Sequence, residues 1–235
     1  MSLPFLVELG TEELPPKALK ALYTSFAEGI ETGLRNAALG FGKIHAFGAP
    51  RRLAVLVEDL ELRQPDQQIE KLGPAVVSAF DKDGNPTKAA EGFARSNGVE
   101  FSQLQRVQTD KGERLAYRSN QEGKFAIDLL PEIVAAALDK LPIPKRMHWG
   151  AKRAEFVRPV HWLVMLQGKQ VIDAEILGIK ASRETRGHRF HANRAFALAN
   201  ALDYQLTLEN EAFVIADFNE RRGRIRAQVE DAGNQ

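Results

Sequence analysis

The hydrophobic side chains between residues 16 and 37 recur every three or four positions, which is the spacing of one face of an α-helix. Leu19, Leu22, Phe26, Ile30 and Leu34 mark that face. The two prolines before it suit a first helical turn, because the backbone N–H groups of that turn have no partner within the helix. The pattern predicts a long helix here, and shorter helices are expected over 88–96 and 127–141.

Short apolar runs predict the strands. Residues 5–9 form one run, and residues 52–60 form another whose interior is so apolar that we expect cover on both faces. Two alternating segments on either side of Asp110-Lys111-Gly112 predict a hairpin within 104–118. Further strands are expected over 160–166 and 171–177, joined by a turn at 167–169, and over 212–216. A basic helix is then expected from Phe218 onward.

Helices and strands alternate without a regular strand–helix–strand rhythm, so the predicted fold class is α+β, with mixed, largely antiparallel sheets and packed helices. Pro131 is tolerable in the helix over 127–141 only if it lies in the first turn. Pro142 and Pro144 stop that helix, and we place a module boundary there. The prediction is an N-terminal α+β module over 1–141 and a basic, β-rich module over 142–235 that ends in a helix.

The net charge of +1 averages over unequal halves. Residues 1–141 carry 17 Lys and Arg against 20 Asp and Glu, whereas residues 142–235 carry 15 against 11. Between 142 and 194, 11 basic residues face 4 acidic ones. Because a polyanion such as RNA is bound by clustered positive charge, this stretch is the candidate polyanion surface.

Composition also excludes several classes of protein. The chain has no cysteine, which removes disulfides, thiolate zinc sites and cysteine nucleophiles. No uncharged apolar run of about 18 residues is present, and the first residues lack the basic and apolar regions of an export signal. The sequence therefore predicts a cytoplasmic protein with no membrane contact.

Familiar catalytic motifs are missing. The sequence has neither of the glycine-rich patterns that cradle nucleotide phosphates, and no serine lies in a nucleophile elbow. His188 and His191 form a close pair, but they lie among arginines, which repel a metal cation, and no acidic third ligand is near. We expect no catalytic residue and no metal site.

Three basic clusters remain as candidates for RNA contact. The first spans residues 183–191 and includes Arg186, Gly187, His188, Arg189 and Phe190. Glycine permits close backbone approach, arginine binds phosphate oxygens in a forked geometry, and the rings stack on bases. In the alternative interpretation, the arginines pair with neighbouring carboxylates while the phenylalanine enters the core.

The second cluster spans residues 145–153 and the third spans 220–226. Trp149 in the second is either a stacking platform or an ordinary packing anchor. The arginines of the third either follow a phosphate backbone or pair with Asp217, Glu220 and Glu230 at helical spacing. Arg51 and Arg52 precede a buried strand, where a structural role is at least as plausible as ligand contact. The candidate RNA-binding residues are Lys145, Arg146, Trp149, Lys152, Arg153, Arg186, His188, Arg189, Arg221 and Arg222.

Several segments resemble, in the same order, the β chain of bacterial glycyl-tRNA synthetase. They are FLVELGTEELPP at 5–16, PRRLAV at 50–55, MHWG at 147–150, FVRPVHW at 156–162, TRGHRF at 185–190 and VIADFNERR at 214–222. The resemblance runs over essentially the whole chain. Several collinear segments are far more specific than any one of them.

The resemblance implies an enzyme of two α and two β chains that joins glycine to tRNA(Gly) with ATP. In that family the α chain binds glycine and ATP, so ATP and Mg are expected there and no cofactor is expected on this chain. The β chain binds and positions tRNA and carries an HD-type domain and an anticodon-binding domain, which are absent here. The resemblance therefore implies an N-terminal fragment, non-catalytic alone, whose partners are the α subunit, tRNA(Gly) and a second β subunit.

Two other functions stay open. The chain could be a structural assembly module that docks the α subunit or the rest of β without RNA contact, and the acidic first half favours this. It could also be an independent enzyme with an unfamiliar site around His188 and His191.

Overall fold

The computed structural model describes residues 1–143, 145–149 and 154–233. The chain divides into two compact units, one made of Met1–Gln64 with Lys124–Gln235 and the other of Pro65–Gly123. This division differs from the predicted boundary at residues 141 and 142. The physical reason is long-range strand pairing, because a strand from the beginning of the chain pairs with one that follows residue 159.

A mixed, largely antiparallel sheet forms the centre of the first unit, as the fold class predicted. Its described strands follow the order β11, β12, β9, β1, β3, β2, and β10 pairs with β9. The contact between β12 and β9 is parallel and the other pairings are antiparallel. The bounds are β1 Ser2–Thr11, β2 Ile44–Ala49, β3 Arg52–Glu61, β9 Val160–Gln167, β10 Gln170–Val171, β11 Glu175–Ile176 and β12 Ile179–Ser182.

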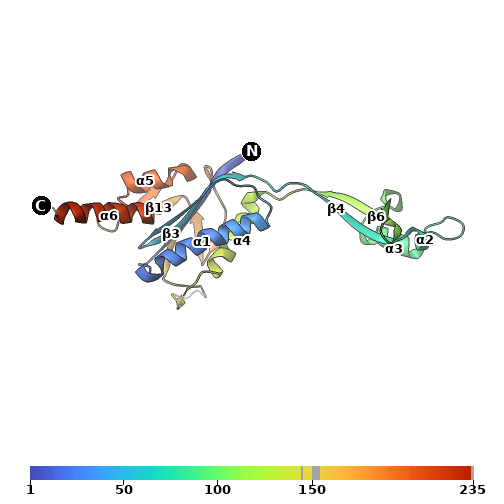
Figure 1. Ribbon diagram of the computed structural model, residues 1–235, viewed down its shortest axis with the longest axis horizontal. Coiled ribbons are helices and arrows are strands. Elements are labelled where there is room, and N and C mark those ends of the chain that lie inside the picture. Colours follow the sequence, from blue (N-terminus) through green and yellow to red (C-terminus); the bar gives the residue numbers. More distant parts are fainter. Residues whose placement is uncertain (144, 150–153, 234–235) are drawn as a thin grey trace. The chain divides into compact units, whose positions relative to one another are not determined.

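Helices and short strands surround this sheet. Figure 1 shows the two helices α1 and α4 lying side by side, with α5 and α6 in another part of the unit. None of the helices in the described ranges is long and apolar enough to cross a membrane. The bounds are α1 Pro16–Asn36, α4 Ala126–Asp139, α5 Tyr204–Asn210, α6 Phe218–Gly233, β7 Met147–His148, β8 Glu155–Phe156, β13 Glu184–Arg186, β14 Ala195–Ala197 and the 3-10 turn Ala201–Asp203.

The two faces of the sheet contribute to two separate apolar clusters. On β1, Phe5, Val7 and Leu9 join the cluster that contains α1 and α4, whereas Leu6 joins the cluster that contains Tyr204 of α5. Side chains of a strand point alternately to opposite faces, which accounts for this division. β3 is divided in the same way, so the predicted cover on both faces is confirmed.

The helix α4 contradicts the expectation for its proline. It begins at Ala126, so Pro131 is the sixth residue and lies beyond the first turn. The proline removes the backbone donor that the carbonyl of Ile127 needs. Ala126, Leu130 and Val134 are nevertheless all buried in the core cluster that α1 shares. Packing of this apolar face stabilises the helix enough for it to continue past Pro131.

Two predicted strands differ from the structure. Residues 171–177 contain only Val171 of β10 and the short β11. β11 ends where Leu177 and Gly178 adopt positive φ angles of 53° and 76° and turn the chain back toward β12. Residues 212–216 form no strand. Val214 N donates to Leu208 O (2.8 Å) and Ala216 O accepts from Gly48 N (3.2 Å), so these groups do not join a strand ladder.

The second unit has a three-stranded antiparallel sheet in the order β4, β6, β5. The predicted hairpin is confirmed: β5 and β6 are joined at Asp110 and Lys111, and Gly112 has a φ of 102°. The predicted helix over 88–96 is also confirmed, and Ala79, Ala90 and Leu115 form a small core. The bounds are β4 Gln67–Ala75, α2 Val76–Ala79, α3 Lys88–Ser96, the 3-10 turn Phe101–Gln103, β5 Gln105–Thr109 and β6 Gly112–Gln121.

Candidate nucleic-acid interface

A buried polar network lies on one face of the central sheet. Glu8 of β1 is buried, and Thr185 of β13 donates its hydroxyl toward both carboxylate oxygens (2.7 and 2.9 Å to Oε1 and Oε2). Arg52 of β3 places Nη1 3.5 Å from Glu8 Oε2, and the indole of Trp162 also donates to this carboxylate. An uncompensated buried charge costs several kcal/mol, so these side chains fix one another in place.

Gly10 makes room for the tryptophan of this network. A Cβ atom at Gly10 would lie 1.8 Å from the Trp162 ring, closer than any real contact. The ring lies on the same face as Glu8, because residues 8 and 10 of a strand point to the same side. The guanidinium carbon of Arg52 lies 5.5 Å from the ring centre and that of Arg51 lies 5.9 Å from it.

The network anchors the loop that contains most of the first basic cluster. We call residues 186–194 the arginine loop; they run from the end of β13 to the residue before β14. Arg52 Nη2 donates to the carbonyl of Arg186 at 2.5 Å, so a buried arginine of the central sheet holds the first residue of the loop. The loop folds back tightly, since a Cβ atom at Gly187 would lie 2.3 Å from the carbonyl oxygen of Ala192.

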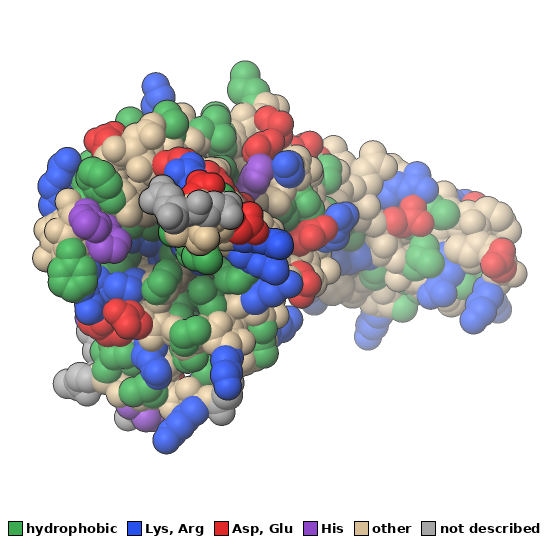
Figure 2. All heavy atoms as spheres, turned by 60° about the vertical axis from the view of Figure 1, so that its left-hand side comes forward, with side chains coloured by type: hydrophobic (Ala, Val, Ile, Leu, Met, Phe, Trp, Pro, Cys, Tyr) green, Lys and Arg blue, Asp and Glu red, His purple; other side chains and the backbone are tan. Residues whose placement is uncertain are grey.

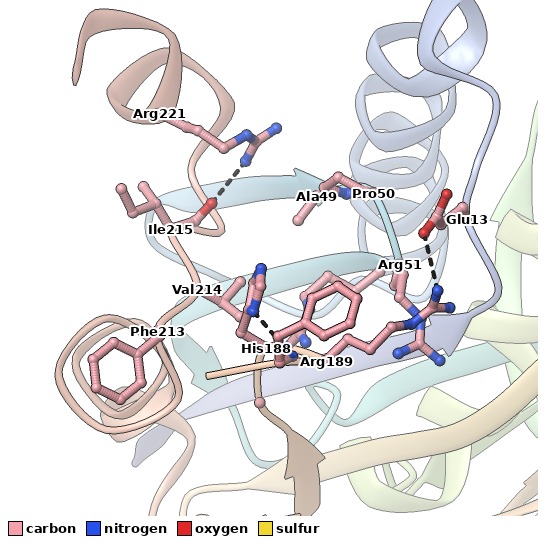
Figure 3. A pocket seen from close by; sticks show the side chains of 13 residues that line it. Glu13, Ala49, Pro50, Arg51, His188, Arg189, Phe213, Val214, Ile215 and Arg221 are labelled. Carbon is pink, nitrogen blue, oxygen red and sulfur yellow. Dashed lines mark hydrogen bonds and ion pairs between the residues drawn. The ribbon is translucent and has the colours of Figure 1, made fainter. Parts of the chain in front are cut away.

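A cavity of about 390 Å³ opens beside the arginine loop. Its walls come from the turn before α1, the β2–β3 turn, the arginine loop, the segment before α6 and α6 itself (Figure 3). The lining residues are Glu13, Ala49, Pro50, Arg51, Arg52, Gly187, His188, Arg189, Phe190, Phe213, Val214, Ile215 and Arg221. Three of the ten candidate residues, His188, Arg189 and Arg221, therefore meet at one site.

The charge in this cavity is mainly positive. Arg189 pairs with Glu13 (3.5 Å) and Glu12 (3.3 Å). Arg221 instead donates to the carbonyls of Ile215 (2.7 Å) and Gly48 (2.8 Å), and burial lowers the pKa of its guanidinium below the ordinary value. In the part of the chain that the structure describes, neither Arg51 nor Arg221 has a carboxylate ion-pair partner.

Aromatic rings stand at the rim. Phe190 is 84% exposed and Phe213 is 59% exposed. The rings of His188 and His191 stack with centres 4.6 Å apart, and each histidine lies about 6 Å from one of the phenylalanines. The alternative in which Phe190 enters the core is therefore wrong. On the face in Figure 2, histidine and hydrophobic side chains lie beside Lys and Arg side chains, with Asp and Glu between them.

A second hollow adjoins the first. It has a volume of about 690 Å³ and shares Glu13, Pro50 and Arg189 with the first cavity. Arg158 also lines it, donating Nε to Glu13 O (3.1 Å) and contacting Met147 Sδ through Nη1 (3.2 Å). Met147, which belongs to the second basic cluster, therefore lies near Glu13, and Glu13 pairs with Arg189 of the arginine loop.

The remaining candidates occupy different settings. Arg186 and Arg222 are exposed on β13 and α6. Arg146 donates to the carbonyl of Asp139 (2.8 Å), Lys145 is exposed, and Trp149 is half-buried against the α1–α4 core, as an anchor would be. Lys152 and Arg153 lie outside the described residues.

The third basic cluster follows its pairing interpretation in part. Arg224 pairs with Glu209 and with Glu220 (2.6 Å to the latter), and Arg226 pairs with Glu230 (2.9 Å). These arginines follow the helical pairing that the sequence offered as the alternative. Arg221 and Arg222 form no such pair among the described residues.

Sequence reasoning missed three residues of the cavity. Arg51 lines it, whereas its neighbour Arg52 belongs to the buried network. Glu13 is the acidic wall and Phe213 is part of the rim. The charge of Arg51 and its place in the family-like segment at 50–55 were available signals. Phe213 carried none, since its exposure and its positive φ of 56° are visible only in the folded chain.

The histidine pair shows no metal geometry. In the described ranges, no three His, Cys, Asp or Glu side chains are placed to hold a metal ion. His188 Nδ1 instead lies 3.3 Å from the backbone nitrogens of Phe190 and His191, which donate to it and stabilise the turn of the arginine loop.

Comparison with known proteins gives a consistent result. A family model described as "Glycyl-tRNA synthetase beta subunit" matches residues 5–235. The chain is 53% identical over 225 residues to the glycine–tRNA ligase beta subunit of Marinobacter nauticus, covering 96% of this chain and 32% of that protein. It is 56% identical over 228 residues to that of Chromohalobacter salexigens, covering 97% and 33%. The chain thus spans about a third of the length of these curated relatives.

Proposed function

The chain belongs to the glycyl-tRNA synthetase beta subunit family, and on this premise we propose that it binds and positions tRNA for a glycine–tRNA ligase. The reaction joins glycine to tRNA(Gly) with ATP. The proposed partners are the α subunit, which binds ATP and Mg, tRNA(Gly), and a second β subunit in an α2β2 assembly in the cytoplasm. No residue of this chain is assigned a role in the chemistry.

The arginine loop is the observation that carries this proposal. The exposed Arg189 and Phe190 line a cavity, and the buried network holds the start of the loop through the carbonyl of Arg186. Arginine binds phosphate oxygens, and each contact releases a condensed counterion. A surface of fixed shape lets binding energy position the RNA, so that its reactive end reaches an active site on another chain.

The proposal is tested with a double substitution in the full-length β subunit assembled with α. Arg186→Ala with Arg189→Ala is expected to lower tRNA affinity about tenfold or more and to reduce the salt dependence of binding by about two counterions. Fluorescence anisotropy over a range of salt concentrations measures both quantities. The matched control is Arg35→Ala with Arg118→Ala, which removes the same charge from two exposed ion pairs outside the three basic clusters.

Control and test variants must differ for the proposal to stand. If both keep wild-type tRNA affinity and aminoacylation, the arginine loop does not contact tRNA. If both lose affinity equally, the effect reflects net charge and not this surface.

A groove between α1 and α4 favours assembly as a second candidate function. It has a volume of about 690 Å³, and its walls combine small side chains such as Ala136 with polar ones such as Glu28 and Gln64. Such a surface suits a helix of the α subunit. Ala136→Arg, which changes an exposed residue, is then expected to weaken α association in sedimentation velocity while tRNA affinity stays unchanged. Unaltered association would remove this groove from the interface.

A further inference from the structure

We propose that the cavity beside the arginine loop binds a single unpaired nucleotide, with Arg51 and Arg189 on its phosphate and Phe190 and Phe213 against its base. The inference rests on the proposed function, and it deepens it by naming the part of an RNA that this site takes. A free mononucleotide has the same chemistry, so the experiment separates the two sources.

The phosphate end of the site is incomplete as it stands. Arg51 lines the cavity, and its Nε is buried with no hydrogen-bond acceptor among the residues that the structure describes. A buried donor without an acceptor costs about 1–3 kcal/mol, so rotation of the guanidinium toward an oxygen that enters the cavity would be favourable. Arg189 stands beside it and, among the residues that the structure describes, pairs with the exposed carboxylates of Glu12 and Glu13, which a phosphate can displace. Figure 3 shows Arg51, Arg189 and Glu13 on one side of the cavity.

The base end has a strained aromatic residue. Phe213 has a φ of 56°, in the left-handed region that a bulky residue adopts only at a cost of about 1–3 kcal/mol. The position lies two residues beyond Glu211, the C-cap of α5, and its positive φ is one that glycine adopts without strain. Its neighbours hold it there, because Ala212 N donates to Thr207 O (3.1 Å) and Val214 N donates to Leu208 O (2.8 Å).

A phenylalanine in place of glycine gains little from packing at this position. The Phe213 side chain is 59% exposed, so burial does not compensate for the backbone strain. Phe190, which is 84% exposed, lines the same cavity. Exposed rings at a basic cavity are platforms for bases, which stack on aromatic side chains with about 1–3 kcal/mol each.

Size and access favour one unpaired nucleotide. A volume of about 390 Å³ lies in the range of small-ligand pockets, roughly 300–1,000 Å³. A base inside a duplex is stacked on both faces, whereas an unpaired base can turn out and stack on a protein ring. The site therefore selects a single-stranded part of the RNA.

The test uses full-length β assembled with α and two RNA hairpins of the same stem. One hairpin has a four-nucleotide unpaired extension and the other ends flush. Phe213→Gly and Phe190→Leu are each expected to weaken binding of the extended hairpin about fivefold or more and to leave binding of the flush hairpin unchanged. Phe125→Leu is the matched control, because it replaces another exposed aromatic ring of the first unit with the same aliphatic side chain.

Phe213→Gly separates the site from folding. Glycine adopts a positive φ without strain, so this variant is expected to unfold at the same or a higher temperature than the wild type while it binds the extended hairpin less tightly. Loss of affinity with a lowered unfolding temperature would instead indicate a structural role and would overturn the proposal.

The remaining outcomes are also decisive. If Phe213→Gly and Phe190→Leu bind both hairpins as the wild type does, or weaken both equally, the nucleotide site is excluded, while the arginine-loop variants decide the proposed function separately. Adenosine monophosphate is the third probe. Suppose that the wild type binds this mononucleotide tightly, and that Phe190→Leu loses this binding but keeps wild-type affinity for both hairpins. This result would show that the occupant is a free nucleotide and not RNA.

Discussion

Glu8 stands where the alternation of β1 would place an apolar residue, since Leu6 on the same face is fully buried. The carboxylate is retained because it holds Thr185, Trp162 and Arg52 together. Sequence reasoning saw only one charge within an apolar strand. Its partners are 44 to 177 positions away along the chain, and no local pattern reveals them.

Removing this carboxylate is expected to be costly. Glu8→Leu leaves Arg52 buried without its counter-charge, so the free energy of unfolding should fall by about 3–5 kcal/mol in urea titrations at pH 7. Glu8→Leu combined with Arg52→Met should recover much of that loss, because an apolar pair replaces the buried ion pair. Glu31→Leu, which breaks an exposed pair with Arg35, should cost less than about 1 kcal/mol. A similar small effect at Glu8 would contradict the network.

Tyr204 makes stability depend on alkaline pH. Burial raises the pKa of its hydroxyl well above the ordinary value of 10.0, and the Glu8 carboxylate raises it further. The folded state keeps this proton above pH 10 while the unfolded chain loses it. The stability contribution is therefore complete below pH 10 and decreases as the pH rises, by up to about 1.4 kcal/mol per pH unit.

Tyr204→Phe tests this titration. The buried hydroxyl has no hydrogen-bond partner among the described residues, so its removal should raise the free energy of unfolding at pH 7 by about 1–3 kcal/mol. Urea titrations between pH 9 and 11 should show a shallower alkaline loss than in the wild type. Tyr117→Phe, in the second unit, is the control: the stability of the first unit should fall with rising pH as steeply as in the wild type. Parallel curves for Tyr204→Phe and the wild type would remove Tyr204 as the cause.

At the scale of elements, the sequence predicted best where one local period runs through the whole segment. The α1 helix has six buried residues at helical spacing, β3 has a continuous apolar interior, and the interior of β1 is apolar apart from Glu8. The strand predictions over 171–177 and 212–216 were wrong, because no single local period runs through these segments. Their apolar composition suits a strand, but positive φ angles at Leu177 and Phe213 turn the chain, and neither residue is a usual turn former.

The α6 helix is held to the sheet mainly at its first turn. Arg221 donates to Gly48 O and Ile215 O, whereas the later residues of α6 are exposed. Arg221→Lys cannot span both carbonyls, so hydrogen exchange of the amides in the first two turns should become about tenfold faster or more. Arg222→Lys, the exposed neighbour, should leave exchange unchanged. Equal exchange in both variants would show that another contact holds the helix.

At the scale of the whole molecule, the predicted boundary at 141 and 142 differed from the observed units because β9 returns to pair with β1. A proline pair signals the end of a helix, but it carries no information about which distant strands pair. The candidate site could be predicted from the sequence only in part, for the same reason. Its arginines stand out in the sequence, yet the meeting of Arg51 with Phe213 is set by the fold.

The second unit should be removable. Gln64 N donates to Lys124 O (3.0 Å) and Lys124 N donates to Gln64 Oε1 (3.1 Å), so the two ends of the first unit are already adjacent. Replacing residues 65–123 with a short Gly-Ser turn should shift the thermal unfolding midpoint of the first unit by only a few degrees, about 1 kcal/mol or less. Near-ultraviolet circular dichroism follows this transition. A chain that loses its native near-ultraviolet signal would contradict the division into units.

The central position of β1 has a consequence during synthesis on the ribosome. β1 and β3 emerge early and can pair at once, but β9 begins only at Val160. At roughly 5–20 residues per second, the other edge of β1 waits on the order of ten seconds for its partner. That edge carries unpaired N–H and C=O groups, which can form hydrogen bonds with strands of other chains. Slower translation between β3 and β9 therefore lengthens the interval in which nascent chains aggregate.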